Sequence, residues 1–313
     1  MNKHHRTLEL DRVLEMLAEQ TTCPAGRELA RQLTPNDNYR DAADALQRTA
    51  DINSLCARYG TPGLGGIRDC TGALQRAKLG ARLSAGEILQ VAQVLRTVRS
   101  IKKWRGQGET PTAADDLFHI LAPVEGLEKD IFDAILSEEE LADNASPALA
   151  DLRRRIRRAQ LKVREQLDGI IRSPQYAKAL QEPIVTMRDG RFVVPVKIEC
   201  KNEVKGLVHD TSSSGATVFI EPMAVVDANN EIRLLQNEEQ LEIDRILQEF
   251  SERIGQVADA TRTSFEALLQ LDLLFAKSRL ADKMKATVPD LNEDGIIEFR
   301  KARHPLIQKD KVV

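Results

Sequence analysis

The densest group of anion-binding side chains in the sequence is a basic run between residues 151 and 164. It comprises Arg153, Arg154, Arg155, Arg157, Arg158, Lys162 and Arg164, offset only by Asp151. Cations at this density are typical of a helix face that contacts nucleic-acid phosphates. They are also typical of a solvated face that pairs with acidic residues elsewhere. Such residues occur at Glu231, Glu238, Glu239, Glu242, Asp244, Glu249 and Glu252.

Heptad position divides this basic run into two sets. A seam of apolar residues at alternating spacings of three and four runs through Leu149, Leu152, Ile156, Ala159 and Val163. The cations that flank this seam and can pair with a second helix are Arg153, Arg155 and Lys162. The cations that point away from it are Arg154, Arg157, Arg158 and Arg164. We expect phosphate contact mainly from the outward set, with a solvated helix face as the alternative.

A second group of candidate phosphate-binding residues lies between residues 188 and 214. Its basic members are Arg188, Arg191, Lys197, Lys201 and Lys205, and they are balanced by Asp189, Glu199, Glu203, Asp210 and Glu221. That balance is not typical of a dedicated DNA groove. The hydroxyl-rich segment Ser212, Ser213 and Ser214 either donates hydrogen bonds to a phosphate or forms a plain turn between strands. Without aromatic residues to stack on bases, sequence-specific reading of single strands is not expected.

The sequence offers no residues that suggest catalysis. It contains no G-x-x-x-x-G-K-[ST] motif to hold ATP phosphates and Mg²⁺. His209-Asp210 resembles part of a metal-dependent hydrolase site, but the other histidines lie far away in sequence. The four cysteines are scattered, which indicates reduced structural thiols. We therefore expect this chain to be no enzyme, with no metal and no cofactor.

The composition favours long, partly exposed helices, because aromatic residues make up 4% of the 313 residues and charged residues 30%. The net charge of −3 provides no global basic field, so nucleic-acid binding must come from local patches. No apolar run reaches about 18 residues, and the N-terminus leads directly into an amphipathic helix. We expect a soluble, cytoplasmic protein.

Helical periodicity predicts a series of helices that position the basic residues. The first seven lie at about 7–20, 23–32, 37–59, 70–80, 84–103, 113–121 and 127–136. Ser146-Pro147 then has the form of an N-cap followed by proline at the first helical position, and this helix extends to about 172. A second heptad pattern runs from Ile232 to Val257, interrupted by Glu239. The two heptad helices are expected to pair antiparallel, followed by a separate helix at 261–286.

The segment between the two heptad helices changes to the two-residue period of strands. Asp189-Gly190 predicts a type I′ hairpin between strands at 184–188 and 191–200, and Pro195 indicates an edge position. Further strands are expected at 206–211, 216–221 and 295–299. The predicted fold is mainly α with a small antiparallel β insertion, in which a helical core carries a long antiparallel coiled-coil arm with a β-containing tip.

The predicted organisation has six parts in chain order. They are a helical core (1–145), an ascending arm helix (146–175), a β-containing tip (176–222), a descending arm helix (223–260), a helical return to the core (261–290) and a short final segment (291–313).

Several stretches of the sequence resemble the MutS superfamily, and specifically its bacterial MutS-two branch. The matching stretches are Leu64 to Asp69, Leu180 to Thr186, Arg191 to Lys197, and His209 to Pro222 followed by Asn229-Asn230. Ala302 to Leu306 resembles the opening of the family's ATPase domain. The resemblance therefore implies the N-terminal core, lever and clamp of such a protein, without its ATPase and Smr nuclease domains.

The resemblance also implies partners and a wider activity. A full-length member is expected to be a homodimer that uses ATP and Mg²⁺, binds branched or double-stranded DNA, suppresses recombination in a manner related to mismatch repair, and splits collided ribosomes through contacts to rRNA. The sequence leaves DNA and the ribosome open as partners. The alternative from another class is a structural coiled-coil spacer or dimerisation module without nucleic-acid contact.

Overall fold

The computed structural model describes residues 7–124, 126–300 and 302–307. The chain divides into two compact units. The first consists of Met1–Asp133, Ser137–Glu139 and Gln248–Val313, and the second of Ala134–Leu136 and Glu140–Leu247. Most described residues are helical, and a single small antiparallel sheet lies in the second unit. The predicted fold class, mainly α with a small antiparallel β insertion, is confirmed.

The first unit is built from short helices around the later part of a long one. Its helices are α2 (Leu10–Ala18), α3 (Pro24–Arg31), α4 (Tyr39–Tyr59), α5 (Thr71–Lys78), α6 (Ala85–Arg105), α7 (Asp115–Ile120) and most of α8 (Leu127–Ala134). Helix α6 begins at a capping box in which Ser84 and Glu87 satisfy each other's backbone N–H groups. Its apolar side chains, from Ile88 to Ile101, are buried, so α6 passes through the core of this unit.

A buried carboxylate joins α3 to the long helix within the first unit. Asp272 is fully buried and accepts hydrogen bonds from the backbone N–H groups of Thr22 and Cys23 and from the Thr22 hydroxyl. These N–H groups lie at the start of α3, where the helix dipole favours a negative charge. Gly26 lies so close that an added Cβ would come within 2.4 Å of the Asp272 carboxylate.

The second unit contains the sheet and the predicted helical pair. Its elements are η1 (Asp143–Ala145), α9 (Pro147–Ile171), β1 (Thr186–Arg188), β2 (Arg191–Lys197), η2 (Ile198–Cys200), β3 (Gly206–Thr211), β4 (Thr217–Pro222) and the start of α10 (Met223–Met284). The strands are antiparallel in the order β1-β2-β4-β3. Asp189 and Gly190 both have positive φ, 49° and 75°, which confirms the type I′ hairpin.

Proline in β2 does not mark an edge strand, and that prediction was wrong. β2 pairs with β4 on one side, and β1 covers its first residues on the other. Where β1 has ended, the Pro195 carbonyl accepts a hydrogen bond from the N–H of Gln181. Along an antiparallel strand, the N and O of one residue point the same way, so the missing N–H of Pro195 faces this irregular segment and no β4 bond is lost.

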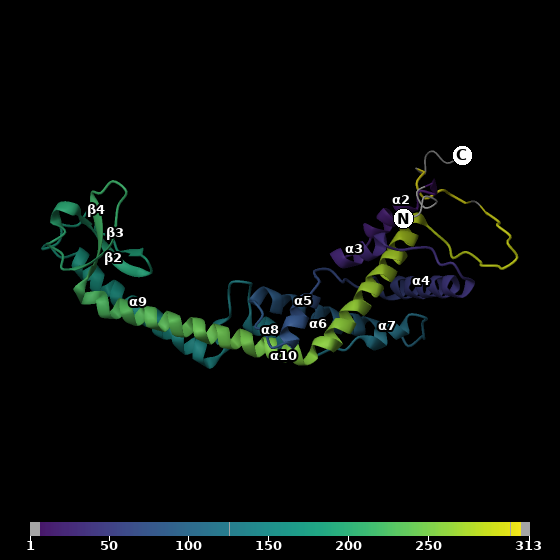
Figure 1. Cartoon of the computed structure of the whole chain (residues 1–313), viewed down its shortest axis with the longest axis horizontal. Coiled ribbons are helices and arrows are strands. Elements are labelled where there is room, and N and C mark those ends of the chain that lie inside the picture. The colour runs from purple at the N-terminus through teal and green to yellow at the C-terminus, as the bar shows by residue number, and fades with distance from the viewer. Residues whose placement is uncertain (1–6, 125, 301, 308–313) are drawn as a thin grey trace. The chain divides into compact units, whose positions relative to one another are not determined.

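Helix α9 pairs antiparallel with residues 223–247 of α10, as Figure 1 shows, and we call these two segments the helical pair. Leu152 and Ile156 pack against Leu235. Further along, Val163 and Ile232 belong to a larger cluster that includes the inner face of the sheet. Ser146 caps α9 as predicted, because its hydroxyl accepts from the N–H of Leu149 and also donates to Glu242.

Two predicted elements differ from the structure. The expected break near residue 260 is absent, and α10 is one continuous helix of 62 residues. Residues 295–299 form no strand, and Ile296, Ile297 and Phe299 are exposed. A strand needs a neighbour for its backbone hydrogen bonds, and no described segment supplies one. Among the helices that the structure describes, none is long and apolar enough to cross a membrane.

Candidate nucleic-acid interface

The cations that flank the seam of the helical pair differ in their partners. Arg153 donates to Glu239 on α10 at 2.7 Å, to Asp143 at 2.7 Å and to the Leu141 carbonyl at 2.8 Å. Arg155 forms only a long ion pair with Glu238, at 3.9 Å. Lys162 is exposed and has no acceptor within the described chain. Arg153 is therefore a structural residue that joins the two helices.

The outward set of α9 is also divided. Arg154 pairs with Asp151 on its own helix, and Arg157 donates to Asp143 at 3.1 Å. Arg158 and Arg164 are exposed, and the described part of the chain gives neither of them a hydrogen bond or ion pair. On this face, the positive charges of Arg158 and Arg164 are thus the ones that no described acidic side chain compensates.

The cations of the sheet are mostly engaged in internal contacts. Arg188 lies 3.9 Å from the ring centre of Phe219 and 3.2 Å from the Asp210 carboxylate. Arg191 donates to Glu221, and Lys197 donates to the carbonyl of Lys178. Arg191, with 15% of its side chain exposed, is the most fully engaged of the three cations.

Two lysines and the serine segment near the sheet are largely exposed to solvent. Lys201 and Lys205 lie in the exposed loop between η2 and β3 and have no acceptor in the described ranges. The Ser212 hydroxyl accepts from the N–H of Thr217 and lies 3.3 Å from that of Ser214. Ser213 and Ser214 are exposed. Ser212 therefore shapes the turn before β4, while Ser213 and Ser214 lie on its surface.

Sequence reasoning missed a buried polar cluster around Glu221. This carboxylate is fully buried and receives hydrogen bonds from Arg191 at 2.8 Å and Asn229 at 2.8 Å, with His209 at 2.5 Å. Arg191 also donates to Asn230 at 2.7 Å. A fully buried carboxylate needs this many donors to offset its lost hydration. The available signal was Glu221, a carboxylate that directly follows the apolar run Val218 to Ile220 of a strand pattern.

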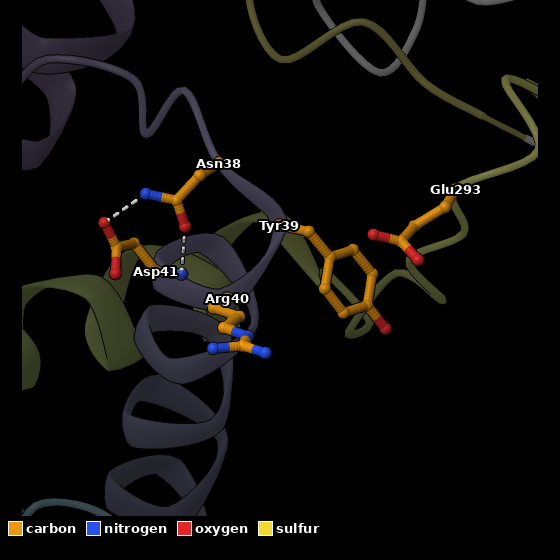
Figure 2. Close-up of a pocket in the computed structure, with 5 residues that line it drawn as sticks. All are labelled: Asn38, Tyr39, Arg40, Asp41 and Glu293. Atoms are coloured by element: carbon orange, nitrogen blue, oxygen red, sulfur yellow. Dashed lines mark hydrogen bonds between the residues drawn. The ribbon is translucent and has the colours of Figure 1, made fainter.

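Metal-binding clusters and hollows are two further features that bear on chemistry. No cluster of three or more metal-binding side chains occurs in the ranges that the structure describes. Figure 2 shows a hollow lined by Asn38, Tyr39, Arg40, Asp41 and Glu293. There the Asn38 side chain accepts from the N–H of Asp41 as the N-cap of α4. Asn38 and Asp41 are therefore used in starting this helix.

Comparison with known proteins gives one consistent family. No protein-family model matches the chain. The chain is 43% identical over 312 residues to Endonuclease MutS2 of Acetivibrio thermocellus, 44% identical over 314 residues to that of Ruminiclostridium cellulolyticum, and 38% identical over 315 residues to that of Clostridioides difficile. These alignments cover 98–99% of this chain and 39–40% of each relative.

Alignments at this level of identity, covering nearly the whole chain, define a protein of the MutS superfamily. This agrees with the motif at residues 209–222. Within the superfamily the chain belongs to the MutS2 family. It spans about 40% of the length of the relatives that it matches.

Proposed function

We propose that the helical pair and the sheet act as a lever and clamp that hold the phosphate backbone of a nucleic acid in a MutS2-type protein. The observation that carries this proposal is the division of the cations. Arg153 and Arg191 are used inside the second unit, whereas Arg158, Arg164, Lys201 and Lys205 are exposed and have no acceptor among its described residues. Uncompensated cations on the helix and on the loop of the sheet favour phosphate contact over internal structure.

The opposite charges of the two helices explain why only some cations are available. Helix α9 carries seven basic and three acidic side chains, and residues 223–247 carry two basic and six acidic ones. On the side of α9 that faces α10, Arg153 pairs closely with Glu239 and Arg155 more weakly with Glu238. The outer side of α9 keeps an excess of positive charge.

The wider activity proposed for the parent protein has two sources: DNA cleavage is suggested by its relatives' names, and ATP hydrolysis, Mg²⁺ binding and dimer formation by the motif resemblance. Those relatives are called endonucleases, and this chain spans about 40% of their length. We assign ATP hydrolysis, Mg²⁺ binding, DNA cleavage and dimer formation to the full-length cytoplasmic protein. The chain described here holds the partner and does no chemistry. Double-stranded or branched DNA and rRNA present the same phosphate chemistry, and both remain candidate partners.

A salt titration with a matched control tests the clamp. The test variant is Arg158→Ala/Arg164→Ala. The control is Arg58→Ala/Arg68→Ala, which removes the same charge from two exposed arginines of the first unit that have no described acceptor. Each lost phosphate contact should reduce the slope of log affinity against log salt by about 0.7–0.9. We expect a change of about 1.4–1.8 for the test variant and none for the control.

Duplex DNA, a four-way DNA junction and an rRNA fragment serve as the three probes, and the tightest binder identifies the partner class. If the test and control variants have equal slopes on all three, the clamp proposal is wrong. The helical pair then has the role of a spacer, in which the basic residues only neutralise α10.

A further inference from the structure

A second group of cations lies in the first unit, where α6 and α8 border an open hollow of about 430 Å³. Arg96 and Arg99 on α6 and Lys129 on α8 supply its positive charge, and Glu128 and Phe132 also line it. Gly126 and the carboxylate of Asp133 complete the lining. None of these residues belongs to the helical pair or the sheet.

Both arginine head groups are held in place by buried partners. The Glu128 carboxylate is nearly buried, with 9% of its side chain exposed, and it accepts from Nε and Nη2 of Arg99 at 2.8 and 3.0 Å. It also accepts from Nε of Arg96 at 3.1 Å. The Arg96 guanidinium stacks on the ring of Phe132, 3.6 Å from its centre. Hydrogen bonds from Arg99 lower the pKa of Glu128, which keeps this anchor ionised.

Several donors of these two arginines remain unused. Both Nη atoms of Arg96 and Nη1 of Arg99 have no acceptor among the residues that the structure describes, and neither does the ammonium group of exposed Lys129. The Arg96 and Arg99 side chains are 44% and 53% exposed. Long side chains normally lose rotamer freedom when they bind, and here Glu128 and Phe132 already restrict them. Three cations outnumber the two carboxylates of the lining, Glu128 and Asp133, so the hollow keeps a net positive charge and its arginines are preorganised for an anion.

We infer that this hollow is a binding site for a phosphate group. Two anchored guanidinium groups and one ammonium group supply donors from three directions, which suits the tetrahedral oxygens of a phosphate better than the planar pair of a carboxylate. The phosphate comes either from a free nucleotide or from a nucleic-acid backbone, and both sources share this chemistry. The site lies in the first unit, so it does not depend on the clamp proposed above.

The test follows the arginine Nε–Hε signals of the full chain by NMR. Inorganic phosphate, adenosine monophosphate and a single-stranded DNA oligonucleotide are added separately, the first two to about 50 mM because isolated anion sites bind with millimolar affinity. We expect the signals of Arg96 and Arg99 to shift with phosphate and those of Arg58 and Arg68 to stay in place. Tighter binding of the mononucleotide than of the oligonucleotide, per phosphate, identifies a nucleotide site, and the reverse identifies a backbone site.

Two variants separate binding from folding. Arg96→Ala leaves Glu128 paired with Arg99, and Lys129→Ala removes a residue that contacts no described partner. Each should weaken phosphate binding about tenfold, as the loss of a charged hydrogen bond predicts, with the thermal unfolding of Lys129→Ala unchanged. The inference is overturned if Arg96 and Arg99 do not respond to any probe. It is also overturned if both variants bind phosphate as the unmodified chain does.

Discussion

Replacing Ile156 with aspartate tests whether the apolar seam holds the helical pair together. Ile156 is 7% exposed and packs against Leu152 and Leu235. Burying an isoleucine side chain stabilises by about 1.5–3 kcal/mol. The substitution loses this term and also places a carboxyl group between two helices, where even its neutral form adds a desolvation cost of about 1–3 kcal/mol. We expect the helical pair to lose about 3 kcal/mol or more, since the terms are additive at such a site.

Charged contacts across the same pair provide the comparison. Arg153 has 18% of its side chain exposed, and its removal would leave Glu239 and the Leu141 carbonyl without a donor, at a cost of about 1–3 kcal/mol. The Arg155–Glu238 contact spans 3.9 Å between half-exposed groups and contributes about 0.2–1 kcal/mol. The expected order of destabilisation is therefore Ile156→Asp, then Arg153→Ala, then Arg155→Ala.

Hydrogen exchange read by mass spectrometry distinguishes the three variants by region. A loss of 3 kcal/mol corresponds to about a 100-fold increase in local opening, since each 1.4 kcal/mol is a factor of ten. For Ile156→Asp this increase should occur in α9 and in residues 223–247, with α6 of the first unit unaffected. Faster exchange in α9 alone would refute the pairing of the two helices. An equal effect of Arg155→Ala would refute the dominance of the seam.

Three further predictions concern ionisable groups. Asp272→Ala should destabilise the first unit by about 3–5 kcal/mol in urea unfolding, because Thr22, Cys23 and Arg279 lose a shared buried acceptor. Arg245, assisted by Ser146, lowers the pKa of Glu242 from 4.5 to about 2. Stability from this contact is complete above pH 4.5 and is lost as the pH falls toward 2, so Glu242→Gln should reduce the loss of helical circular dichroism in that range. Burial raises the pKa of the Cys70 thiol to about 12, so Cys70 should not react with a thiol reagent at pH 8 until the chain unfolds.

Local signals in the sequence were sufficient for the elements whose ends depend on local chemistry. Ser146-Pro147 begins α9 because a serine cap and an N1 proline act within one helical turn. Asp189-Gly190 forms the hairpin because both residues tolerate positive φ. These features need no knowledge of distant residues.

The continuity of α10 could not be predicted, because it depends on tertiary burial. The heptad pattern ends near Val257, and the next apolar group begins at Phe265, which suggested two helices. In the structure Thr261 and Ser264 are buried between them, and the Ser264 hydroxyl accepts from the N–H of Ala122. Polar residues that are buried against another segment look like a helix boundary in a one-dimensional pattern.

The hydrogen-bond partners of individual cations likewise could not be predicted from the sequence. Heptad position assigned Arg157 to the outward set, yet it donates to Asp143, which precedes α9 and is placed by the short helix η1. The register of the helical pair could not be predicted either, and in the structure Ile156 packs against Leu235. The length of the segment between two helices does not fix their register, because the sheet determines where α10 begins.

The Glu221 cluster bears on how a bound partner would act on the second unit. Arg191 of β2 bonds to Glu221 of β4 and to Asn230 of α10, and Asn229 of α10 bonds to Glu221 and to the backbone of Phe192. Strands and helix are therefore joined by charged hydrogen bonds in a buried setting, where such bonds are strong. A sheet attached in this way cannot rotate on α10 without breaking several of them together. Force applied at the sheet would thus pass into the long helix directly, which is the mechanical requirement of a clamp mounted on a lever.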